Sequence, residues 1–251
     1  MSKFEFRQSL KAMAVVCAAV GSMVAGQAQA VTLAELISTN GTITVGDKLF
    51  SDFAYTADGF TNDATGLVWG GTAADYLAQA ALITVTGSQL DGNWGLDFMG
   101  NWHVNGATAN ANIDYKVTVL DPAKYLSDFH LDGSPSVIGA SGQAQVIESV
   151  NSVGGHGAIP TVPNDLLTIY SATGVGTDVN DVSFTAAGNF PRAAMIETDI
   201  ILSALPGSQA SLGHVQESFS QSPVPEPSTY AMVLAGLAAV GVVARRNGKT
   251  A

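Results

Sequence analysis

The strongest secondary-structure signal in this sequence is residues 112–119, which read Asn-Ile-Asp-Tyr-Lys-Val-Thr-Val. Polar and apolar residues alternate along the segment, so that Ile113, Tyr115 and Val117 share one face. Because side chains of a strand point alternately to opposite faces, this pattern predicts a half-buried β-strand. The middle of the chain is therefore expected to form a sheet with one buried face.

Further strands are expected on both sides of this segment, at 42–45, 50–55, 82–86, 143–150, 166–170, 182–185, 194–202 and 215–219. Turn dipeptides such as Asp58-Gly59 and Asn105-Gly106 separate several of them. Helices are expected only at 33–38, 73–80 and 122–128. Many short strands joined by turns predict a mainly β fold, an antiparallel, jelly-roll-like β-sandwich with few short helices.

The chain is acidic, and its ends differ from its middle. The 251 residues include 21 acids and 10 bases, for a formal net charge of −11, and only 12% are charged. Residues 31–222 hold four bases and nineteen acids, a net charge of −15. Such a surface repels nucleic acid, so a nucleic-acid partner is excluded.

Residues 1–30 have the three parts of a secretory signal peptide. An apolar stretch at 12–25 follows a basic start, which contains Lys3, Arg7 and Lys11. Ala28 and Ala30 form a small-x-small cleavage pattern, so cleavage is expected after Ala30. The alternative is an uncleaved membrane anchor. The only cysteine, Cys17, lies in this segment, so the mature chain would have no disulfide.

The C-terminal segment has a different three-part pattern. Pro225, Glu226 and Pro227 precede an apolar run, which Arg245 and Arg246 close. Two prolines so close break a helix, and an uncharged run with basic residues after it predicts a single transmembrane helix over 229–244. The apolar run at 230–244 would span about 23 Å as a helix, slightly short of a hydrocarbon core. The alternative is a buried C-terminal helix of the domain.

This pattern resembles the PEP-CTERM sorting signal of exported proteins in Gram-negative bacteria that make extracellular polysaccharide. The resemblance covers the last 28 residues and implies recognition by exosortase, a membrane enzyme. Together with the signal peptide (1–30) and the acidic β-sandwich domain (31–222) inferred above, the sorting signal (223–251) completes the expected division of the chain. The resemblance implies processing by that enzyme. It also implies a transient anchor in the inner membrane, followed by transfer to the cell envelope or the extracellular space.

The domain shows no motif for catalysis, and an enzyme is not expected. No Gly-x-Ser-x-Gly elbow and no His-Glu-x-x-His pair occurs. Glu148 and Glu197 lie in apolar strand-like segments and are the best pair for a glycosidase, which needs two carboxylates across a cleft. The alternative, which we favour, is that both face solvent.

Two kinds of ligand remain open. Acidic loops could supply oxygen ligands for calcium, through Asp58, Asp63, Asp178 and Asp181. Turn formation explains the same residues, so no cofactor is expected beyond this calcium. Trp94 and Trp102 lie close together beside Asn and Asp residues and could stack on sugar rings. The alternative is that both rings fill the core of the sandwich.

These observations favour a structural or adhesive protein of a polysaccharide matrix, such as a biofilm or floc. The alternative is a carbohydrate-binding module or a glycan-active hydrolase. The expected partners are an exosortase-like membrane enzyme and extracellular polysaccharide.

Overall fold

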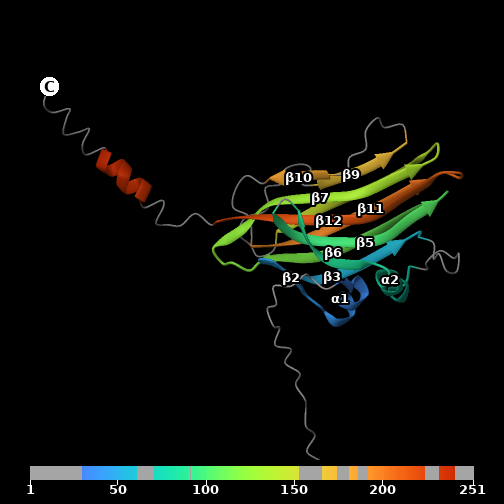
Figure 1. The fold of residues 1–251 in the computed structure, drawn as a ribbon, viewed down its shortest axis with the longest axis horizontal. Helices are drawn as coiled ribbons and strands as arrows, with labels where there is room; N and C mark the ends of the chain where they lie inside the picture. Colours follow the sequence, from blue (N-terminus) through green and yellow to red (C-terminus); the bar gives the residue numbers. More distant parts are fainter. Residues whose placement is uncertain are drawn as a thin grey trace, which may run out of the picture.

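The fold was analysed in a computed structural model that describes residues 30–60, 71–90, 92–152, 166–173, 181–185, 192–223 and 232–240. Within residues 30–223, the described part of the chain forms two antiparallel six-stranded sheets and two short helices beside them (Figure 1). The first sheet has the order β1 (Val31–Thr32), β4 (Thr84–Leu90), β5 (Asn93–Asn105), β12 (Gln209–Pro223), β7 (Lys124–Ile138) and β10 (Asp181–Thr185). The second has the order β2 (Ile43–Val45), β3 (Lys48–Asp58), β6 (Thr108–Val119), β11 (Ala193–Ala204), β8 (Gly142–Ser152) and β9 (Leu166–Ala172).

The connections repeatedly cross from one sheet to the other. From β5 onward, the strands β5-β12-β7-β10 of the first sheet face β6-β11-β8-β9 of the second. The last strand, β12, lies between β5 and β7 and closes the middle of the first sheet. The prediction of a mainly β, antiparallel two-sheet fold is confirmed.

Aromatic rings from both sheets meet in the core. Tyr115 of β6 lies 5.6 Å from Phe98 of β5 and 6.4 Å from Phe219 of β12, measured between ring centroids. Ile113, Tyr115 and Val117 are fully buried, as the alternation of 112–119 predicts. Since each large buried side chain contributes about 1.5–3 kcal/mol, this interface between the sheets holds the domain together.

The two helices begin at the predicted residues. α1 (Leu33–Thr39) is capped by Thr32, whose hydroxyl accepts a hydrogen bond from the amide of Glu35. α2 (Ala73–Ala80) begins with a capping box between Thr72 and Asp75. Such caps satisfy the free amides of a first helical turn.

Two stretches differ from the sequence expectation. The helix expected at 122–128 is wrong, because β7 begins at Lys124 and buries alternate residues such as Leu126 against the opposite sheet. The strand β5 was not expected, because glycines and asparagines interrupt its pattern. Its inward residues Leu96 and Phe98 are nevertheless fully buried. In both stretches packing between the sheets overrides local propensity.

The C-terminal segment is described only over 232–240, which is helical and exposed. No helix among the described residues is long and apolar enough to cross a membrane. The transmembrane helix over 229–244 therefore stays a prediction, and the rest of it lies outside the described residues.

Candidate functional site

A pocket opens between the two sheets at one end of the sandwich, with a volume of about 680 Å³. We call it the end pocket. Turns and strand ends far apart in sequence line it, namely Asp47, Lys48, Gly92, Asn93, Trp94, Lys124, Tyr125, Ser127, Asp128, Phe219, Ser220, Gln221 and Ser222. Its size lies within the range of small-molecule sites, roughly 300–1,000 Å³.

Trp94 supplies an aromatic wall of the end pocket. It follows the turn between β4 and β5, in which Leu90 pairs with Asn93. Its indole is half-buried and packs against Gly46, where a Cβ atom would come within 2.4 Å of ring atoms. Gly46 has a φ of +56° in the turn between β2 and β3. The absence of a side chain there therefore sets the position of the indole.

A buried lysine is among the residues that line the pocket. Lys48 begins β3, is almost fully buried and donates a hydrogen bond from Nζ to Asp47 Oδ1 at 2.8 Å. Gln221 Nε2 donates to the other carboxylate oxygen of Asp47. Burial lowers the pKa of Lys48, although the carboxylate of Asp47 acts in the opposite direction.

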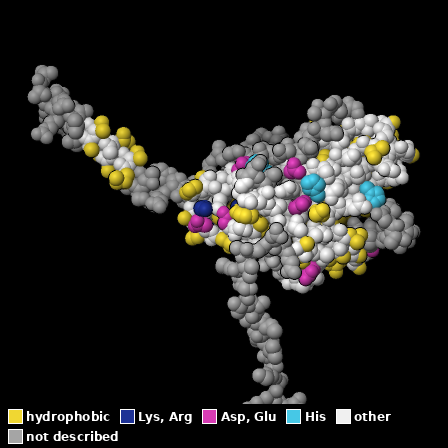
Figure 2. Space-filling view, viewed as in Figure 1, with side chains coloured by type: hydrophobic (Ala, Val, Ile, Leu, Met, Phe, Trp, Pro, Cys, Tyr) yellow, Lys and Arg dark blue, Asp and Glu magenta, His cyan; other side chains and the backbone are white. Residues whose placement is uncertain are grey.

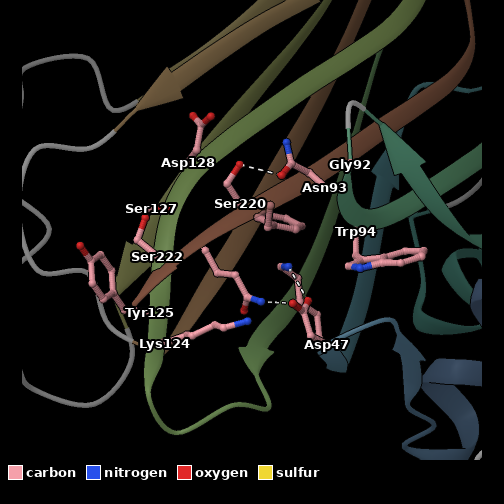
Figure 3. A pocket seen from close by; sticks show the side chains of 13 residues that line it. Asp47, Gly92, Asn93, Trp94, Lys124, Tyr125, Ser127, Asp128, Ser220 and Ser222 are labelled. Atoms are coloured by element: carbon pink, nitrogen blue, oxygen red, sulfur yellow. Dashed lines mark hydrogen bonds and ion pairs between the residues drawn. The ribbon is translucent and has the colours of Figure 1, made fainter. Parts of the chain in front are cut away.

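Polar groups from the first sheet complete the end pocket. Ser220 donates a hydrogen bond to Asn93 Oδ1 at 2.9 Å. Figure 3 shows Trp94 and Tyr125 on opposite sides of the pocket. The carbonyl oxygen of the Gln221 side chain is buried and has no hydrogen-bond partner among the described residues. The pocket therefore combines aromatic rings with hydrogen-bond donors and acceptors.

A second group of polar side chains lies deep between the sheets. We call Tyr115, Glu148, Thr198 and Glu217 the core carboxyl cluster. Tyr115 donates a hydrogen bond to Glu217 Oε2, and Thr198 donates to Glu217 Oε1 at 2.6 Å. Glu148 is fully buried, and neither of its oxygens has a hydrogen-bond partner among the described residues.

Burial controls ionisation in the core carboxyl cluster. It raises the pKa of Glu217 to about 7, although the hydrogen bonds from Thr198 and Tyr115 act to lower it. Burial, followed by the charge of Glu217, raises the pKa of Glu148 well above its usual range. Charged carboxylates are costly in an apolar interior, so this cluster favours the neutral acid.

The structure separates the two glutamates that the sequence offered as a glycosidase pair. Glu197 is exposed on β11, whereas Glu148 points into the core from β8. The expectation that both face solvent is therefore wrong for Glu148. No opening to this cluster is apparent from the described residues, because all four members are fully buried.

The two tryptophans proposed as sugar contacts lie in different surroundings. Trp94 lines the end pocket, whereas Trp102 is 4% exposed and belongs to the core. Nε1 of Trp102 donates to the hydroxyl of Tyr55 at 3.4 Å. The Trp102 ring thus offers no face to a ligand, whereas Trp94 stays a candidate sugar contact.

Other ionisable groups of the first sheet form pairs. His214 lies 3.4 Å from Asp97, and His130 lies 3.0 Å from Asp128. Burial raises the pKa of Asp97, and the nearby His214 acts to lower it. His103 and these two histidines lie on strands, and His156 lies outside the described residues.

The side chains of the four aspartates proposed as calcium ligands lie mostly outside the described part of the chain. Asp58 is exposed at the end of β3, the side chain of Asp181 is not described, and Asp63 and Asp178 lie outside the described residues. Within the described ranges, no three His, Cys, Asp or Glu side chains are placed to hold a metal ion.

The sorting residues also lie outside the described residues, namely Pro225, Glu226, Pro227, Arg245 and Arg246. Ala28 of the cleavage pattern lies there too, and Ala30 is exposed at the first described position.

Comparisons with known proteins identify the C-terminal segment. Residues 223–247 match the model of the PEP-CTERM protein-sorting motif. No curated protein matches the chain.

Two solved structures are similar to the chain at a low level. One is the enzymatically active domain of tailspike protein 4 of bacteriophage CBA120, with 15% identity and a TM-score of 0.26 over 66% of this chain and 19% of that one. The chain thus spans about a fifth of the tailspike structure.

The other structure is TmCBM61 in complex with beta-1,4-galactotriose. Its identity is 8% and its TM-score 0.27, over 68% of this chain and 88% of that one. TM-scores this low show neither a common fold nor a common ligand.

The chain thus joins a β-sandwich-like domain to a C-terminal sorting segment. That segment is a PEP-CTERM sorting motif, which implies export and processing by exosortase, a membrane enzyme.

Proposed function

We propose that the protein is a non-catalytic component of an extracellular polysaccharide matrix, and that its β-sandwich binds saccharide at the end pocket. The observation that carries this proposal is the half-buried Trp94 ring beside amide, hydroxyl and charged groups. Aromatic rings bury the apolar face of a ligand, and a few placed polar groups fix its orientation.

The strand order supports a jelly-roll-like assignment. Strands β5-β12-β7-β10 and β6-β11-β8-β9 follow the order expected of eight strands wound as a double Greek key. This architecture includes lectin domains. Because one fold serves many functions, the proposal depends on the pocket rather than on this likeness.

The bonding within the end pocket favours binding over hydrolysis. Both oxygens of Asp47 accept hydrogen bonds, one from Lys48 and one from Gln221. Asp128 lies 3.0 Å from His130. A glycosidase needs one carboxyl as acid and a second as base or nucleophile. The engagement of Asp47 argues against such a role.

We further propose the sorting route that the motif implies in a Gram-negative bacterium. The signal peptide is removed after Ala30, and residues 229–244 hold the chain in the inner membrane with the domain outside. An exosortase-like enzyme then acts at Pro225-Glu226-Pro227 and releases the domain to the envelope or matrix. Replacing Pro225 and Pro227 by Ala should leave the full chain in the inner membrane, and normal release would refute the role of the motif.

The binding proposal is tested by sedimentation of the full chain with the host's own extracellular polysaccharide. We expect saturable binding without release of reducing ends. Parallel samples with calcium and with EDTA test whether the acidic loops contribute. Depolymerisation would show an enzyme, and no binding in either buffer would refute the proposal.

A further inference from the structure

The few cations of the domain gather at the end pocket. Residues 31–222 contain four bases, and two of them, Lys48 and Lys124, line the pocket. A third, Arg192, donates to the carbonyl of Val119, the residue that pairs with Lys48 across β6 and β3. In Figure 2 the visible Lys and Arg side chains lie at this end, on the left. The fourth base, Lys116, lies elsewhere and pairs with Asp52.

Among the described residues at and beside the end pocket, acids and bases are equal in number, although the domain as a whole is strongly acidic. Asp47, Asp121 and Asp128 balance the three bases near it. The remainder of residues 31–222 therefore carries the whole formal charge of −15. An anionic ligand is repelled from the rest of the surface and meets least repulsion here.

One ammonium group of the pocket is available to a ligand. Lys48 is buried and bonded to Asp47, whereas Lys124 is 37% exposed and lies 3.8 Å from an exposed carboxylate, that of Asp121. An ion pair at such an exposed site is screened by water and contributes little. Lys124 can therefore leave Asp121 for a ligand carboxylate at small cost.

The two lysines also repel one another. The positive charge of Lys124 contributes to lowering the pKa of Lys48, after burial itself. The ammonium of Lys124 is a single point charge and can pair with one singly charged group of a ligand, such as the carboxylate of a sugar acid.

We infer that the saccharide bound at the end pocket is acidic, and that a uronic acid carboxylate pairs with Lys124 while a sugar ring packs on Trp94. This inference rests on the proposed function and adds the class of polysaccharide. The charge distribution, the exposure of Lys124 and the aromatic wall carry it together.

The test compares the host's extracellular polysaccharide with the same material after its carboxyl groups have been reduced to alcohols. Binding of the full chain is measured by sedimentation at low and at physiological salt. The variants are Lys124→Gln and, as a matched loss of one positive charge away from the pocket, Lys116→Gln. We expect carboxyl reduction to weaken binding at least tenfold, and Lys124→Gln to remove most of that difference while Lys116→Gln preserves it.

The outcomes separate this inference from the proposed function. Equal binding of both polysaccharides would overturn the acidic ligand and leave a saccharide pocket. Equal effects of the two variants would overturn the role of Lys124. No binding to either polysaccharide would refute the proposed function as well. A Lys124-dependent affinity for phosphatidylglycerol vesicles in place of polysaccharide would assign the cationic end to a membrane surface and overturn the inference.

Discussion

The end pocket and the core carboxyl cluster both place ionisable side chains at inward-facing positions of the sandwich. On β3, Lys48 and Phe50 both point toward the core. On β12, Glu217 and Phe219 do the same. At the open end, however, Lys48 has a carboxylate partner and an adjoining pocket. In the closed middle, the hydrogen-bond partners of Glu217 among the described residues are neutral hydroxyl groups, and a second buried carboxyl lies nearby.

This difference decides what each region can do. At the mouth of the sandwich, the carboxylate of Asp47 acts against the lowering of the Lys48 pKa by burial, and the neighbouring pocket residues can contact a ligand. A carboxyl in the dry interior is driven to the neutral form, because desolvation of the charge outweighs two hydrogen bonds. The first region is suited to binding and the second to controlling stability with pH.

The largest expected effect is the pH dependence of the core carboxyl cluster. The pKa of Glu217 is raised from 4.5 to about 7, so the folded state binds this proton more tightly than the unfolded state. The free energy of unfolding therefore falls as the pH rises through this range, by about 3 kcal/mol for this group. Denaturant unfolding at pH 5 and pH 8 measures the loss.

A double variant isolates that effect. Glu148→Gln with Glu217→Gln keeps the side-chain shapes but removes both protons, so the loss between pH 5 and pH 8 should shrink. Glu197→Gln removes an exposed carboxyl of β11 and should leave the loss unchanged. An unaltered pH dependence in the double variant would contradict the assignment.

A smaller effect is expected from the hydroxyl donors of the cluster. Tyr115→Phe removes one donor to Glu217 and should destabilise the domain by about 1–3 kcal/mol. Because that hydrogen bond lowers the pKa of Glu217, its loss should also move the midpoint of the pH dependence upward. Tyr170→Phe, on the half-exposed Tyr170 of β9, is the control. Equal stability of the two variants would show that the donor to Glu217 contributes nothing.

At the end pocket, Trp94→Ala should weaken polysaccharide binding at least tenfold, about 1.4 kcal/mol. The half-buried ring lies at the edge of the core, so the domain should stay folded. Tyr170→Ala removes an aromatic ring that does not line the pocket and should preserve binding. Unchanged affinity of Trp94→Ala, measured by sedimentation, would remove the aromatic wall from the proposal.

The smallest effect is expected where a glycine positions that ring. Gly46→Ala introduces a methyl group within 2.4 Å of the Trp94 indole, and the displaced ring should weaken binding roughly threefold. Gly207→Ala is a matched control, because Gly207 also has a positive φ but nothing lies within 4 Å of its added Cβ. Both variants should lose similar stability from backbone strain, and only Gly46→Ala should lose affinity. Equal affinities would show that Gly46 does not position the ring.

Local sequence patterns predicted much of the fold. Alternation gave the strand at 112–119, and the turn at Gly46-Asp47 joins the strands expected on either side of it. The strand β5 was not predicted, because Gly95 and Gly100 interrupt the alternation of polar and apolar residues along it. Its pairing with β12, more than a hundred residues later, supplies what the local pattern lacks.

The two polar regions were less accessible to sequence reasoning, for different reasons. Glu148 lies two residues from both Val146 and Val150, which are buried on the same strand. The alternation of the sequence therefore did indicate that Glu148 points inward. No local signal places Gln221 against Asp47, because the two residues are 174 positions apart in sequence and the sheet order brings them together. Trp94 was predicted from the sequence as a sugar contact. Its position in the pocket, however, depends on the packing of its indole against Gly46, which the sequence alone does not show.

Hydrogen–deuterium exchange of the full chain, with and without the host's extracellular polysaccharide, tests the saccharide site most directly. The account predicts that the polysaccharide protects amides around residues 46–48, 92–94, 124–128 and 219–222, which form the end pocket. Protection confined to the outer face of the first sheet, around Asp97 and His214, would contradict it.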